Sequence, residues 1–245
     1  MPRSMHEHPH LAEILLLYGG AGIYMIDGRR YTAQKGDLIL YNSHVVHDEH
    51  GGSGSGLSIY CIAVSGLCVD GLPQGHILPA SLSPIQSTGD DFDEFMALFG
   101  AIEKEAPAHP ETAHYLTLSL LTKISAHLAE HGKKEEAAVP STVRTARAYI
   151  DQNYKDAICL EDIARATHTN PYYLAHLFKE EVGLPPMKYV ALRRIGEAQN
   201  LLINTEMTVT QIAAQVGYNN SNYFQSVFKR AMGITPREYR VRWVR

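Results

Sequence analysis

A pattern that occurs twice in the C-terminal part of the chain constrains the fold most strongly. Nine positions of one copy match nine of the other, at an offset of 49 residues for the first two and 50 for the rest. The first copy has Ile163, Ala164, Tyr173, Leu174, Phe178, Lys179, Gly183, Pro186 and Tyr189. The second has Ile212, Ala213, Tyr223, Phe224, Phe228, Lys229, Gly233, Pro236 and Tyr239. Nine matches in register indicate a duplicated unit, with one additional residue in the turn of the second copy.

Each copy has the pattern of two short helices around a turn. In the second copy, apolar residues recur at helical spacing up to Val216, and Gly217 has the backbone freedom that a helix end requires. Asn220 is the expected N-cap of the next helix. In the first copy, Asn170 is suited to the cap and Pro171 to the first helical position. A longer helix over roughly residues 187–202 is expected to join the copies.

The second helix of each copy is expected to present one face outward. In the second copy this face is polar, with Asn222, Gln225, Ser226 and Lys229, followed by Arg230. Asn and Gln can pair with adenine edges, Ser can bond to bases, and Lys and Arg neutralise phosphates. The equivalent residues of the first copy are Tyr172, Ala175, His176 and Lys179. We predict that these nine residues contact DNA, although amphipathicity alone is common to surface helices.

Charge divides the chain in a way that favours this interpretation. The net charge of −4 over 245 residues would by itself argue against a nucleic-acid partner. However, residues 139–245 carry 14 Lys and Arg against 9 Asp and Glu, whereas residues 1–138 carry 8 against 17. A basic C-terminal domain on an acidic body is typical of a DNA-binding protein whose other half has a different task.

These residues together resemble the AraC/XylS family of transcription regulators. The joining helix carries the family's residues Arg194, Ile195, Ala198, Leu201 and Leu202, and residues 217–240 follow its second motif. The first copy departs mildly from the family, because Asn170-Pro171 stands where Ser is usual. The resemblance implies an all-α domain at 141–245 with two helix-turn-helix motifs that bind successive major grooves of promoter DNA. It also implies a small-molecule effector and allows RNA polymerase as a partner.

The N-terminal half has the pattern of short strands separated by turns. Five strands are expected between Leu11 and Val64, with a hairpin at Asp27-Gly28 and a turn at residues 35–37, which is typical of a small barrel or jelly roll. This half resembles the cupin-like sensor domain of many AraC-type regulators. The fold class expected is therefore α+β and multidomain, with a cupin-like barrel at 1–80, a helical dimerisation segment at 81–131, a linker at 132–140 and the DNA-binding domain. Related barrels usually carry residues before the first His motif, so this one is expected to lack an edge strand or to begin upstream.

Glu13 is the most informative residue of this half, because a carboxylate on an apolar strand needs a partner. His47 or a ligand hydroxyl would supply one, and we predict that Glu13 and His47 line the ligand pocket. The cupin resemblance also implies a metal set of His6, His8, Glu13 and His47, although Asn42 and His44 replace the usual Pro and Gly. Three imidazoles and one carboxylate would suit Zn, Mn, Fe or Ni. Two points argue against a metal. His6 lies near the chain start, and most related barrels bind organic ligands.

The segment between the two halves is expected to be helical. One apolar stripe is expected to pack on the barrel, and it consists of Phe92, Phe95, Met96, Phe99 and Ile102. The helix over roughly residues 111–130 carries a wider apolar arc, with Tyr115, Leu116, Leu118, Leu120, Leu121, Ile124 and Leu128. Such an arc has two neighbours to bury against, and a second subunit can be one of them, so we predict a homodimer. His127 and His131 are expected to lie at a solvated helix end, since no third metal ligand is near.

Cysteine usage and hydropathy indicate the compartment. The three cysteines are scattered, without the spacing of a disulfide framework or a thiolate zinc site, so a reducing cytoplasm is expected. The sequence has no signal-type segment, and its longest apolar runs are too short to span a bilayer, so no membrane partner is expected.

The leading functional hypothesis is a non-enzymatic transcription regulator whose barrel senses a small molecule. The alternative is a metal-dependent cupin enzyme tethered to a DNA-binding domain, which turnover with bound metal would distinguish. A third hypothesis, a DNA-alkylation sensor, needs a reactive cysteine in a zinc site, and none of the three cysteines has that setting. The identity of the effector, the operator and the sign of regulation do not follow from the sequence.

Overall fold

A computed structural model describes residues 4–48, 56–135 and 139–243, so residues 136–138 of the expected linker lie outside the description. The strands are β1 (Leu11–Gly19), β2 (Ala21–Ile26), β3 (Arg29–Gln34), β4 (Asp37–Tyr41), β5 (Ser58–Ser65) and β6 (Ile85–Ser87). The helices that follow them are η1 (Gly89–Asp91), α1 (Phe92–Glu105) and α2 (Pro110–His131). The C-terminal helices are α3 (Ser141–Asn153), α4 (Leu160–Ala166), α5 (Pro171–Val182), α6 (Pro186–Asn204), α7 (Val209–Gln215), α8 (Ser221–Met232) and α9 (Pro236–Trp243).

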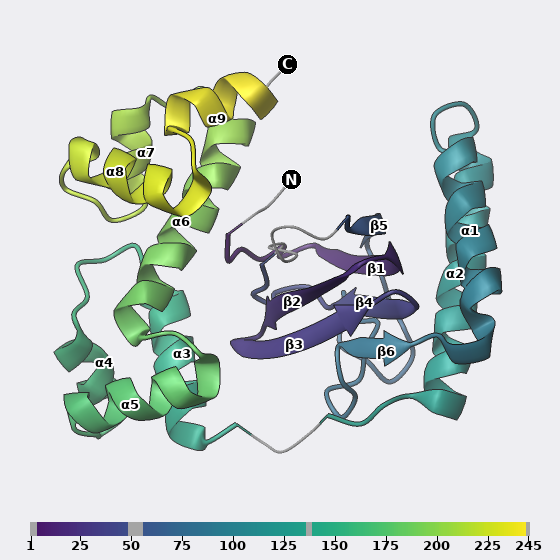
Figure 1. Ribbon diagram of the computed structural model, residues 1–245, viewed down its shortest axis with the longest axis horizontal. Helices are drawn as coiled ribbons and strands as arrows, with labels where there is room; N and C mark the ends of the chain where they lie inside the picture. The colour runs from purple at the N-terminus through teal and green to yellow at the C-terminus, as the bar shows by residue number, and fades with distance from the viewer. Residues whose placement is uncertain (1–3, 49–55, 136–138, 244–245) are drawn as a thin grey trace.

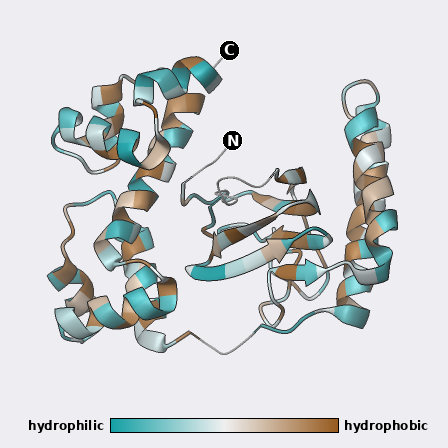
Figure 2. Cartoon of the chain, in the orientation of Figure 1, coloured by the Kyte–Doolittle hydropathy of each residue, from teal (hydrophilic) through white to brown (hydrophobic). Residues whose placement is uncertain are grey.

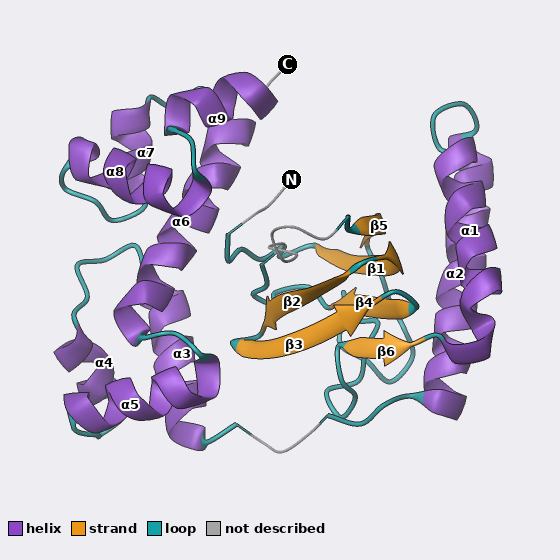
Figure 3. Cartoon of the chain, viewed as in Figure 1, coloured by secondary structure: helices purple, strands orange, loops and turns teal. Residues whose placement is uncertain are grey.

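These elements form three parts, which we call the sheet domain (β1–β6), the helical pair (α1 and α2) and the C-terminal domain (α3–α9). The sheet domain lies between the other two, with the helical pair on one side and the C-terminal domain on the other (Figure 1). All strands belong to the first part and all helices of the C-terminal domain follow the linker (Figure 3). The expected mixed fold class is confirmed. Within the described residues, no helix is both long and apolar enough to cross a bilayer.

The sheet domain consists of two antiparallel sheets. One has four strands in the order β5-β1-β4-β6, and the other is the hairpin β2-β3. The hairpin turns at Asp27-Gly28, as the sequence predicts, and both residues adopt the positive φ that a two-residue turn requires. Strand β6, which pairs with β4 through Ile85 and Gln86, was not expected. It extends the sheet beyond residue 80, where the sequence places the end of the barrel.

Strand β1 is buried on both faces, which explains its nearly continuous apolar sequence. Ala12, Ile14 and Leu16 belong to the core that the sheet shares with the helical pair. Leu15 and Leu17 point to the opposite face and pack in the core between the two sheets. Because side chains alternate along a strand, Glu13 shares the inner face with Leu15 and Leu17.

The helical pair packs on the outer face of the four-stranded sheet. Its residues in the core shared with the sheet are Phe95, Phe99, Ile102, Leu120, Ile124 and Leu128, and apolar residues recur along both helices (Figure 2). Two large apolar residues of α2 are exposed outside this core, since Tyr115 is 72% and Leu118 46% exposed. The helical pair therefore covers the sheet with one face and leaves part of the apolar arc of α2 uncovered.

The expectation of a solvated helix end is wrong for His127. Its side chain is buried, and its two ring nitrogens lie 2.9 Å from Asp91 Oδ2 and 2.9 Å from the Ser87 carbonyl oxygen. Asp91 stands at the N-cap position of α1 but makes no capping hydrogen bond. It accepts hydrogen bonds from His127 and from Lys123 instead, and these hold the pKa of Asp91 below its usual range. His127 thus joins α2 to the segment that enters α1.

The C-terminal domain contains the duplicated unit as two helix-turn-helix motifs joined by α6. Residues 171–180 and 221–230 have the same order of buried and exposed positions. As predicted, Asn170 and Asn220 cap the second helices, accepting hydrogen bonds from Tyr172 N at 2.8 Å and Tyr223 N at 3.0 Å. The turns differ in length by one residue and in the residue that takes the left-handed conformation. His168 takes the left-handed conformation in the first motif, and Gly217 takes it in the second.

Gly217 is expected to be the more sensitive of two left-handed glycines. A Cβ at Gly217 would lie 2.5 Å from the Lys155 carbonyl oxygen, whereas a Cβ at Gly233 would have no neighbour within 4 Å. Both are left-handed, so Gly233→Ala should lower the free energy of unfolding by about 1–2 kcal/mol, the cost of this conformation. Gly217→Ala should lower it by more, because backbone must also move. Urea denaturation followed by circular dichroism measures both, and equal losses would show that the contact with Lys155 is unimportant.

Candidate functional site

The four residues of the predicted metal set converge in the sheet domain. Their ligand atoms, one each from His6, His8, Glu13 and His47, all lie within 4.8 Å of one another. Glu13 Oε2 is 3.0 Å from His47 Nε2, and Glu13 Oε1 is 3.5 Å from His8 Nε2. His6, Glu13 and His47 are buried, and His8 is partly exposed. The structure therefore also brings together the two residues predicted to line the ligand pocket.

Backbone pairing places the imidazoles of this cluster. The segment before β1 pairs with the segment after β4 through two hydrogen bonds between His6 and His47, each 2.9 Å long. Glu13 lies opposite Tyr41 in the β1–β4 ladder. The Tyr41 ring stacks on the His47 ring with 3.9 Å between centroids. Glu13 is thus held by a strand, and His6 and His47 are held by a β-bridge. The backbone of His8 is held by a hydrogen bond of 3.0 Å that its carbonyl oxygen accepts from His44 N.

Hydrogen bonds to the backbone also set the tautomer of two rings. His6 Nδ1 lies 2.8 Å from the Ser4 carbonyl oxygen, and His47 Nδ1 lies 2.9 Å from the Val45 carbonyl oxygen. A carbonyl oxygen can only accept, so Nδ1 must be the donor in both rings. In the neutral imidazole the lone pair is then on Nε2, the atom that faces the cluster. Histidines that bind metals are oriented by the same kind of hydrogen bond.

The charge state of Glu13 suits a cation. Burial acts to raise the pKa of Glu13, but the hydrogen bond with His47 and the charges of His47, His8 and His6 outweigh burial and lower the pKa below its ordinary value. With His47 neutral, its Nε2 lone pair would face a carboxylate oxygen at 3.0 Å. A proton or a metal ion between the two atoms removes that repulsion. The donor set and its geometry therefore fit a divalent transition metal.

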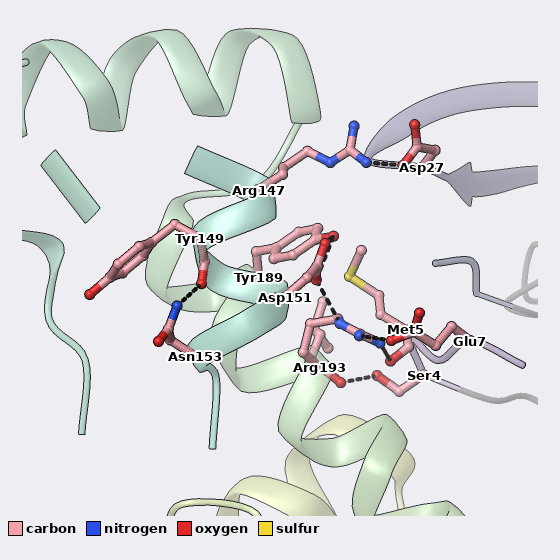
Figure 4. A network of polar contacts seen from close by, with 11 residues as sticks. Ser4, Met5, Glu7, Asp27, Arg147, Tyr149, Asp151, Asn153, Tyr189 and Arg193 are labelled. Atoms are coloured by element: carbon pink, nitrogen blue, oxygen red, sulfur yellow. Dashed lines mark hydrogen bonds and ion pairs between the residues drawn. The ribbon is translucent and has the colours of Figure 1, made fainter. Parts of the chain in front are cut away.

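The segment that carries His6 and His8 also contacts the C-terminal domain (Figure 4). Glu7 Oε1 lies 2.6 Å from Arg193 Nη2 of α6. Ser4 donates hydrogen bonds through its backbone nitrogen to Gln199 Oε1 and through its hydroxyl to the Leu192 carbonyl oxygen. Histidines 6 and 8 of this segment therefore contribute to the cluster, while the residues between and before them contact α6. We call residues 4–8 the N-terminal segment.

Two further contacts join the domains. Arg147 of α3 forms an ion pair with Asp27 at the tip of the β2-β3 hairpin (Figure 4). Met5, Met25 and Val46 of the sheet domain belong to the same hydrophobic core as the first helix-turn-helix motif. No local pattern in the sequence marks these contacts. Charged residues such as Arg147 and Arg193 on amphipathic helices are indistinguishable, in a single sequence, from ordinary solvated residues.

The residues predicted to contact DNA lie on the surface of α5 and α8. Tyr172, His176 and Lys179 are exposed on α5, and Ala175 between them is partly exposed. On α8 the exposed residues are Asn222, Ser226, Lys229 and Arg230, with Gln225 partly exposed. Arg230 differs in one respect, because it also lines a cavity between the two domains. Each helix therefore presents a free face, and α8 has the more polar one.

Comparison with known proteins gave two family models and many relatives. The models are a helix-turn-helix domain, which matches residues 163–242, and an AraC-like ligand-binding domain, which matches residues 2–121. The uncharacterised transcriptional regulator YdiP of Escherichia coli K12 is 24% identical over 96% of this chain and 80% of its own. The transcriptional activator RhaR of Cronobacter sakazakii is 24% identical over 97% of this chain and 87% of its own. Among solved structures, the C-terminal domain of AraT, a response regulator from Geobacillus stearothermophilus, is 33% identical over 44% of this chain and 91% of that domain, with a TM-score of 0.43.

Substitution of Asn222 tests whether α8 recognises bases. If Asn222 makes a bidentate base contact, Asn222→Ala should weaken binding to a selected specific site by about 1–3 kcal/mol and leave binding to random DNA nearly unchanged. Fluorescence anisotropy at fixed salt measures both affinities. Asn219→Ala, in the exposed turn before the helix, is the matched control and should bind both DNAs as the wild type does. Equal losses on the two DNAs would exclude base recognition by Asn222.

Proposed function

Because the chain belongs to the AraC family of transcriptional regulators, with a ligand-binding N-terminal domain and a DNA-binding helix-turn-helix domain, we propose that it responds to a divalent transition metal. The metal would be held by His6, His8, Glu13 and His47. The observation that carries this proposal is the convergence of their four ligand atoms within 4.8 Å. The relatives are named as transcriptional regulators, which favours regulation over the alternative of a metal-dependent enzyme.

The route from the metal to DNA in this proposal is the N-terminal segment. A metal would fix His6 and His8 of this segment. The segment also includes Glu7 and Ser4, which contact Arg193 and Gln199 of α6. Helix α6 joins the two helix-turn-helix motifs, so its position relative to the sheet domain determines where both reading helices lie. Metal binding would thus favour one arrangement of the two domains. The shift in this equilibrium can be no larger than the difference in the metal's affinity for the two arrangements.

The proposal extends to assembly and partners. We propose a homodimer formed through the exposed apolar residues of α2, Tyr115 and Leu118, which the helical pair leaves uncovered. Each subunit would bind two successive major grooves through the residues of α5 and α8 named above, and the dimer would bind two such half-sites. Its site of action would be promoter DNA in the cytoplasm, with RNA polymerase as a further partner.

Metal titration tests the sensor. Cobalt(II) should bind the full chain at one ion per subunit and raise its melting temperature, since a ligand that binds only the folded state stabilises it. Glu13→Gln and His47→Ala should each weaken binding by at least about 10–100-fold, the loss seen even for residues that only support a ligand. His10→Ala, an exposed histidine two residues beyond the cluster, is the control and should bind normally. Wild-type affinity in the Glu13→Gln protein would refute the site.

Sedimentation tests the dimer interface. Leu118→Lys would bury an unpaired charge in the proposed contact and should give folded monomers that bind a paired DNA site more weakly. Ala97→Lys places the same charge on the exposed surface of α1 and should leave the dimer intact. Circular dichroism must first show that both proteins are folded. A folded Leu118→Lys protein that sediments as a dimer would assign the interface elsewhere.

A further inference from the structure

A cavity of about 650 Å³ lies between the sheet domain and the C-terminal domain. Its walls come from the β2-β3 hairpin and the N-terminal segment on one side, and from α6 and α8 on the other. None of the four residues of the metal cluster lines it. Its volume lies within the 300–1,000 Å³ that is usual for sites that bind small organic molecules.

The walls of this cavity are mostly apolar and partly uncovered. Ile23 of β2 is 48% exposed, and Tyr223 of α8, which faces the cavity from the other domain, is 62% exposed. Leu192 of α6 and Val227 of α8 also line the cavity and are half-buried. An apolar group placed in the cavity would remove surface of both domains from water at once, which is favourable in proportion to the area covered.

Positive charge is concentrated at the same cavity. Arg30 of β3, Lys188 of α6 and Arg230 of α8 all line it. In the part of the chain that the structure describes, none of the three side chains forms a hydrogen bond or ion pair with another residue. The one carboxylate of the lining, Asp48, already accepts a hydrogen bond from the Met25 backbone nitrogen at 2.9 Å. The cavity therefore combines an apolar wall with an excess of positive charge.

We propose that this cavity binds an amphipathic organic anion, a molecule with an apolar body and one carboxylate. The apolar body would lie against Ile23, Leu192 and Tyr223, and the carboxylate would pair with the guanidinium and ammonium groups. Arg30 and Arg230 are suited to this because a guanidinium bonds a carboxylate through two parallel hydrogen bonds. This is a second effector site, separate from the metal cluster and of different chemistry.

The position of the cavity gives such a ligand access to DNA recognition. Tyr223, Val227 and Arg230 line the cavity, and Asn222 and Ser226 of the same helix are exposed on its free face. A bound anion would contact both β3 of the sheet domain and α8 of the C-terminal domain. It would therefore restrain the second reading helix directly, without passing through the N-terminal segment.

Three probes with the same ten-carbon chain test the proposal on the full-length protein, below the concentrations at which they form micelles. Decanoate should bind with one molecule per subunit in isothermal titration calorimetry and raise the melting temperature. Decanol, which lacks the charge, should bind at least tenfold more weakly. Decyltrimethylammonium, which carries the opposite charge, should not bind in the range where decanoate saturates. Equal binding of decanoate and decanol would overturn the assignment, as would a failure of decanoate to bind.

Variants locate the site. Arg30→Gln combined with Lys188→Gln should weaken decanoate binding at least tenfold and leave decanol binding unchanged, whereas Arg237→Gln, an exposed arginine of α9 outside the cavity, should alter neither. Ala191→Trp would fill the cavity from α6 and should abolish binding of both probes. Cobalt(II) titration of the same variants checks that the sheet domain is intact, and its result separates this proposal from the metal proposal. Undiminished decanoate binding in the double variant would place the anion elsewhere.

Discussion

Arg193 of α6 is a buried cation whose partners come from both sides of the contact between the two domains. Its side chain is only 3% exposed, and a buried guanidinium is tolerated only with charged or hydrogen-bonding partners. One partner is Asp151 of α3, at 2.8 Å, within the same domain. The other is Glu7 of the N-terminal segment, at 2.6 Å, with the Met5 carbonyl oxygen at 3.4 Å. Arg193 of the C-terminal domain therefore obtains part of its hydrogen bonding from the N-terminal segment.

The N-terminal segment also packs closely against α6, so the contact between them is steric as well as electrostatic. Gly196 of α6 faces the Met5 carbonyl so closely that a Cβ there would lie 2.1 Å from the oxygen. Met5, Met25 and Val46 fill the core of the first helix-turn-helix motif from outside the C-terminal domain. A change that displaces the N-terminal segment would thus open a hydrophobic core and leave Arg193 with Asp151 alone. Both effects are large on the scale of protein stability, which makes the segment a sensitive link between the metal cluster and α6.

Local signals made much of the fold predictable. Caps such as Asn170 and Asn220, the left-handed Gly217 and the spacing of apolar residues act within a few positions, so a single sequence reveals the duplicated motif. The four cluster residues were nominated by family motifs, and the alternation of β1 explains why Glu13 faces inward. The contacts of Arg193 with Glu7 and of Arg147 with Asp27 join residues 186 and 120 positions apart, and no local pattern marks them. The same limit explains the error at His127, whose partners Asp91 and Ser87 lie 36 and 40 positions away.

In the proposed route from the cluster to DNA, the N-terminal segment transmits metal binding to α6, and amide hydrogen exchange measures this transmission. Cobalt(II) added to the full-length protein should slow exchange in residues 4–8 and also in the part of α6 that contacts them, around Arg193 and Gly196. The same addition to the Glu13→Gln protein should leave both regions unchanged. Slower exchange confined to the sheet domain of the wild type, with α6 exchanging at the same rate with and without metal, would show that the segment does not transmit metal binding to α6.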